Sequence, residues 1–146
     1  MDISRIDKFL TVYEKYLPRD KIMWLRERLI NIDETTYNKV IDVDLKNPTT
    51  AFWLSFILGE WGLGRFYIGD AGLGIIKLLT GLTYKILYLG KIMQSNPLVL
   101  VLQAICCLVC ATINIIDWFK ISNRTKEKNF QHIMEVIDFS THYGSY

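Results

Sequence analysis

The chain has 146 residues, 51% of them hydrophobic, and a net charge of +2, which excludes a nucleic-acid binder that works by bulk positive charge alone. Residues 48–121 carry five Lys/Arg and three Asp/Glu across 74 positions, whereas residues 1–47 carry nine of each sign. Because a soluble domain spreads its charges to keep its surface wet, this distribution predicts that the middle of the chain lies in a lipid bilayer.

The N-terminal segment, residues 1–47, is predicted to be a small cytoplasmic helical domain. Residues 3–17, 19–31 and 34–45 each place apolar side chains at the spacing of one helical face. The segment is too short to bury a sizeable core alone, so we expect it to fold against copies of itself or against the membrane.

Basic residues of this domain lie among aromatic ones, and a cation beside an aromatic ring can hold a nucleotide or single-stranded nucleic acid. The alternative is a solvated face, with the aromatic rings in a helix–helix core. Residues 19–28 could equally touch anionic lipid. The candidate ligand-binding residues are Lys15, Arg19, Lys21, Arg26 and Arg28.

Residues 48–121 are predicted to form a transmembrane domain with two full spans, at 49–68 and 98–119, because both segments are long and apolar enough. Residues 73–93 are apolar but carry three lysines, which favours an amphipathic or re-entrant helix. Basic residues flank both spans, so the positive-inside rule predicts that both termini are cytoplasmic. With a C-terminal tail helix in residues 122–146, the predicted fold is an all-α integral membrane protein.

The stretch that follows the first apolar segment is dense in glycine and contains an Arg-Phe-Tyr run. Glycine permits close helix approach or a tight turn, and arginine beside aromatic rings suits a membrane boundary. The pattern resembles the TM-two (two-transmembrane-helix) domain family of small membrane proteins. The matching residues are Leu58, Gly59, Gly62, Arg65, Phe66, Tyr67, Ile68 and Gly69, then Gly74, Ile75, Lys77, Leu78 and Leu79, and finally Ile116 and Asp117.

The resemblance covers roughly residues 46–123 and has two departures. Gly64 stands where animal members have Asp and many bacterial ones have His, and residues 81–112 form a longer link than usual. The family has no single agreed activity, so the resemblance implies architecture more than function. It implies a multi-pass protein of the bacterial inner (plasma) membrane. In bacteria, such proteins are similar to membrane effectors encoded beside signalling enzymes, including anti-phage defence systems.

The last apolar segment carries a stripe of polar residues on one helical face. Polar side chains in a bilayer face partners or water. Because two spans per chain cannot enclose a conduit, the stripe could line a pore only in an oligomer. Alternatively, it packs against glycine-rich surfaces, with Asp117 paired to Arg65 or Lys77. The candidate pore-lining residues are Gln103, Cys107, Cys110, Asn114 and Asp117.

We expect neither an enzyme nor a cofactor or metal site, because no glycine loop suits a phosphate, no Ser or Cys has a plausible His partner, and no His lies near the three cysteines. The favoured function is an oligomeric membrane effector that forms a gated ion channel or pore. Its expected partners are further copies of the chain, the bilayer, and a nucleotide, a single-stranded nucleic acid or a signalling enzyme encoded nearby. The alternatives are a membrane anchor that presents the N-terminal domain to a partner protein, and a nucleotide or nucleic-acid sensor without a channel.

Overall fold

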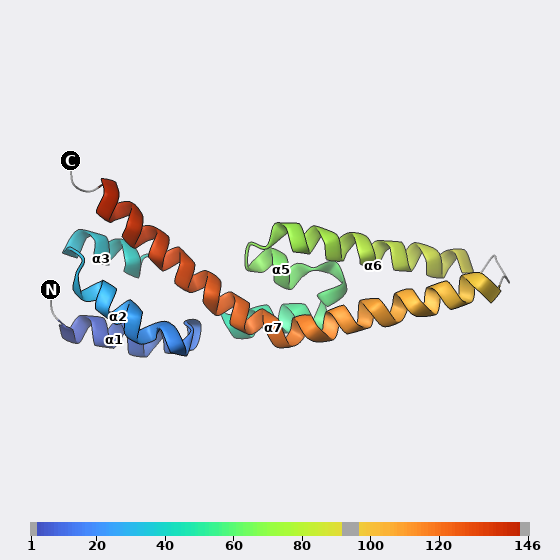
Figure 1. Ribbon diagram of the computed structural model, residues 1–146, viewed down its shortest axis with the longest axis horizontal. Coiled ribbons are helices and arrows are strands. Elements are labelled where there is room, and N and C mark those ends of the chain that lie inside the picture. Colours follow the sequence, from blue (N-terminus) through green and yellow to red (C-terminus); the bar gives the residue numbers. More distant parts are fainter. Residues whose placement is uncertain (1–2, 92–96, 144–146) are drawn as a thin grey trace. The chain divides into compact units, whose positions relative to one another are not determined.

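The computed structural model describes residues 3–91 and 97–143, and every regular element in these two ranges is a helix (Figure 1). The predicted all-α fold is therefore confirmed. The ends of two predicted segments, at 92–93 and 144–146, lie outside the described residues. The chain divides into two compact units, of which the first comprises residues 1–48 and 123–146 and the second residues 49–122.

The first unit is built from short helices that bury their apolar faces against the end of a long one. Its elements are α1 (Ile3–Tyr13), the 3-10 turns η1 (Glu14–Tyr16) and η2 (Arg19–Lys21), α2 (Ile22–Ile30), α3 (Glu34–Ile41) and the part of α7 (Pro97–Tyr143) that begins at Asn123. Between the two turns, Pro18 has extended backbone, which separates α1 from α2 because proline fixes its own φ and cannot continue a helix.

The core of the first unit draws on both ends of the chain. Ile6, Leu25 and Tyr37 come from α1, α2 and α3, and they are buried together with Ile133 and Ile137 of α7. Each buried side chain of this size contributes about 1.5–3 kcal/mol. The part of α7 from Asn123 to Tyr143, which lies within the predicted tail helix of residues 122–146, thus completes the core that residues 1–47 are too short to form alone.

A buried asparagine holds α7 to the connecting segments of this unit. The side-chain amide of Asn129 donates to the carbonyl oxygens of Tyr16 at 2.9 Å and Lys46 at 2.8 Å. Its Oδ1 accepts from the backbone N–H of Lys46 at 2.9 Å. Buried polar groups need such partners, so one side chain satisfies backbone groups from two connections.

Replacing Asn129 by alanine should lower the free energy of unfolding of the full chain by about 2 kcal/mol, because partly buried backbone groups of Tyr16 and Lys46 lose their partner. Urea denaturation in mild detergent, followed by tryptophan fluorescence, measures the change. Gln131→Ala, at an exposed position on the same helix, is the control and should stay within about 0.5 kcal/mol of the wild type. Equal stability of the two variants would contradict the assigned role.

The first turn of α3 is capped by Asp33, whose carboxylate accepts from the hydroxyls of Thr35 and Thr36 and from the backbone N–H of Thr36. Such N-cap bonds satisfy a donor that the helix itself leaves without a partner. The hydrogen bonds, first that from Thr35 and then that from Thr36, lower the pKa of Asp33 from 3.8 to about 2.

This shift predicts a pH-dependent contribution to stability. Because the pKa of Asp33 is lower in the folded chain than its ordinary value of 3.8, the cap contributes fully above that pH and its contribution is lost as the pH falls towards 2. The stability difference between wild type and Asp33→Ala should therefore be constant near neutral pH and shrink in acid. Denaturation curves at pH 7, 4 and 2 test this, with the exposed Asp138→Ala as control. A difference that does not change with pH would refute the cap.

The second unit contains α4 (Pro48–Ile57), the 3-10 turn η3 (Gly59–Trp61), α5 (Leu63–Tyr67), α6 (Ala71–Lys91) and the first part of α7. The predicted assignment of the spans needs correction. Residues 49–68 do not form one helix, because α4 ends at Ile57 and Gly62 has a left-handed φ of 68°. Two helical stretches are long and apolar enough to cross a membrane, 71–90 and one within 103–142, and the second overlaps the predicted span at 98–119. The first lies in the segment that was predicted to be amphipathic or re-entrant.

Candidate functional site

The break between α4 and α6 depends on glycines that other parts of the unit approach closely. A Cβ on Gly62 would lie 2.6 Å from the carbonyl oxygen of Gly74, and Gly62 also has positive φ. A Cβ on Gly64 would lie 3.0 Å from the backbone nitrogen and the Cβ of Ser55. The absence of side chains at these positions allows α5 to pack directly on α4 and on the start of α6.

This packing places Arg65 of α5 in a buried ionic network. Its side chain is 10% exposed, and it donates one bond to Asp70 at 2.9 Å and another to Asp117 of α7. Asp117, whose side chain is 4% exposed, also accepts a bond from Lys77 of α6. The Lys77 ammonium donates further to Oδ1 of Asn114 at 3.1 Å.

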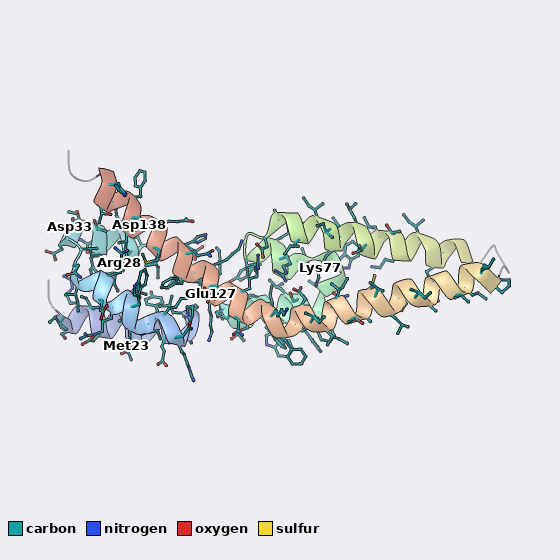
Figure 2. All side chains as sticks on the ribbon, viewed as in Figure 1. Met23, Arg28, Asp33, Lys77, Glu127 and Asp138 are labelled. Carbon is teal, nitrogen blue, oxygen red and sulfur yellow. The ribbon has the colours of Figure 1, made fainter. Side chains whose placement is uncertain are left out.

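The network contains two cations and two anions, so its formal charges cancel. Figure 2 labels Lys77, which lies on the side of α6 towards α7. The structure gives Asp117 both partners that the sequence offered as alternatives, Arg65 and Lys77. Asp70 was not among the predicted members of the network, because the run Gly69-Asp70-Ala71-Gly72 is typical of a turn and indicates nothing more. Its position five residues after Arg65, where a turn can return to α5, is the signal that could have identified it.

A pocket of about 160 Å³ lies beside the network, between α6 and α7. Three of the predicted pore-lining residues, Cys107, Cys110 and Asn114, share its wall with Lys77. Gln103 is buried, and its Oε1 accepts no hydrogen bond from the described residues. The remaining lining residues are Gly59, Thr80, Gly81, Ala111 and Ile113. The pore-lining role of the stripe stays a prediction.

In the first unit, all five candidate ligand-binding residues contact other residues of the fold. Arg26 donates to Asp7 at 2.7 Å, and Lys21 pairs with Glu127 at 2.5 Å. The Arg28 guanidinium lies 5.1 Å from the centre of the Trp24 ring.

The other two candidates, Lys15 and Arg19, line a cavity of about 330 Å³ together with Lys126 of α7. Arg19 is 3.9 Å from Glu14, and the Lys15 ammonium lies 5.2 Å from the ring centre of Tyr16. The five residues therefore do not gather in one pocket, and their ligand-binding role stays a prediction.

Because Gly64 is in close contact with Ser55, its replacement by alanine should change the stability differently from the replacement of a glycine in open space. Gly64→Ala should destabilise the full chain by about 1–3 kcal/mol, because the new methyl group meets the backbone of Ser55. Gly72→Ala, where a Cβ meets nothing within 4 Å, should be neutral or stabilise the chain by up to about 1 kcal/mol. Denaturation in mild detergent measures both variants. Equal effects would show that α5 does not pack on α4 as described.

Comparison with known proteins identifies a family for part of the chain. The model of the family described as the TM2 domain matches residues 44–95. No curated protein and no solved structure shows a match. The matched segment includes Arg65, Lys77 and the glycine-rich turn but ends before Asp117. The chain is thus a small membrane protein whose residues 44–95 match the TM2 domain, the family that its Arg-Phe-Tyr and Gly-Ile-x-Lys-Leu runs resemble.

Proposed function

We propose that this protein is a non-enzymatic, oligomeric membrane effector that forms a gated ion channel controlled at the first unit. The observation that carries the proposal is the pocket between α6 and α7, which lies beside the Arg65–Asp117–Lys77 network. Ionisable groups within an apolar unit are costly unless they face partners or a water-filled cavity, and they often mark ion pathways. The family resemblance adds a bacterial inner membrane and anti-phage defence to the proposal.

The helix α7 offers a route from control to gating. Its residue Asn129 is bonded into the first unit, and its residues Asn114 and Asp117 belong to the network of the second. We propose that a ligand or partner that changes the packing of α7 in the first unit acts along this helix on the bonds of Asp117 to Arg65 and Lys77. Closed and open arrangements would then differ in how completely the network is formed, which gives a ligand two states to select between.

The surface of the second unit is compatible with lipid and with further copies of the chain. Large apolar side chains such as Ile86 of α6 and Leu108 of α7 are exposed. Two spanning helices of one chain cannot enclose a conduit, so the proposed channel requires several copies. Its wall would be the polar face of α7, after that face has separated from α6.

Ion flux through the purified protein in liposomes tests this proposal. Asp117→Asn weakens the bonds that join α5 and α6 to α7, so it should raise the flux without any added ligand. Adding Asn114→Leu to Asp117→Asn should lower that flux by about tenfold, which corresponds to a barrier raised by about 1.4 kcal/mol. Ile115→Leu, at an exposed position next to Asn114, is the matched control and should leave the flux unchanged.

A protein that is monomeric in mild detergent, and whose Asp117→Asn variant conducts nothing, would contradict the channel. That outcome would favour the membrane anchor, in which the first unit, residues 1–48 with the part of α7 that begins at Asn123, would retain its function on a different anchor.

A further inference from the structure

The ionic network presents a cation to the pocket between α6 and α7. Of its four charged residues, Lys77 lines the pocket, whereas Arg65, Asp70 and Asp117 do not. The Lys77 ammonium has three protons, and two of its bonds go to Asn114 and Asp117. The third proton can therefore be donated into the pocket.

Two further kinds of polar side chain on the wall can donate, whereas the hydroxyl of Thr80 already donates to the carbonyl oxygens of Ile76 and Lys77. Asn114 uses its Oδ1 to accept the bond from Lys77, which leaves its amide NH₂ as a donor. The thiols of Cys107 and Cys110 are weak donors. Among the described residues that line the pocket there is no carboxylate. The one formal charge on the described wall is thus the positive charge of Lys77, which is paired with Asp117 outside the lining.

We propose that this pocket is a hydrated binding site for a small anion such as chloride, with Lys77 as its charged ligand. The volume of about 160 Å³ is several times the space that one water molecule needs, so an anion can enter with part of its hydration shell. The role of the site rests on the proposed channel function, because the site would hold an anion in the closed arrangement, in which α6 and α7 lie together. The site itself can be tested without measuring conduction.

The test uses Cys107, which lines the pocket, as a reporter in the full chain in liposomes. Cys106→Ala and Cys110→Ala leave it as the single thiol. Its rates of modification by a negatively charged and a positively charged methanethiosulfonate reagent are measured, and each rate is divided by that of the same reagent with a small free thiol. The normalised rate should be higher for the anionic reagent by about tenfold, because a lysine nearby attracts one reagent and repels the other.

Three variants assign the effect to Lys77. Lys77→Gln should bring the normalised ratio close to one, and Lys77→Arg should keep it high because the charge is retained. Lys85→Gln is the control: Lys85 lies two turns further along α6, with its ammonium 4.2 Å from the centre of the Trp61 ring, and it does not line the pocket. The Lys85→Gln variant should change the normalised ratio by less than about twofold.

The proposal is overturned if the cationic reagent reacts faster, if neither reagent reacts, or if Lys77→Gln leaves the ratio unchanged. A high ratio in a protein that conducts no ions would support the anion site and refute the channel. Ion conduction together with a normalised ratio near one would support the channel and refute the anion site.

Discussion

The second unit depends on Asp117, because a carboxylate in an apolar environment needs cations or hydrogen-bond donors at both of its oxygens. Its two oxygens accept bonds from Arg65 and Lys77, so the helices that carry these two cations are bound to α7 through one side chain. A buried charge that loses its partner typically costs several kcal/mol. Any arrangement of the unit must therefore keep these groups together or let water reach them.

The interruption of the helix between Ile57 and Ala71 allows Arg65 to reach Asp117. A straight helix through residues 49–68 would place Arg65 far along its own axis from the start of α4. With Gly62 in the left-handed region, the chain reverses instead, and α5 returns towards α4. The glycines thus determine the position of a charged group, because the close backbone packing that they allow fixes where the Arg65 guanidinium lies.

The sequence predicted the parts of this structure that depend on local pattern. The helices of the first unit begin and end within a few residues of their expected bounds, because their apolar periodicity is strong. The partners of Asp117 were also expected, since an acidic residue in a span needs a cation.

The parts that depend on tertiary contacts were not predictable. The length and apolarity of residues 49–68 are those of a span, whereas Gly62 adopts its conformation where it meets Gly74. Nor does a polar residue in a polar tail indicate a structural role, yet Asn129 bonds to Tyr16 across 113 positions of sequence. This bond also constrains topology: wherever the first unit lies outside a bilayer and keeps this bond, the polypeptide between Lys46 and Asn129 begins and ends on the same side of that bilayer.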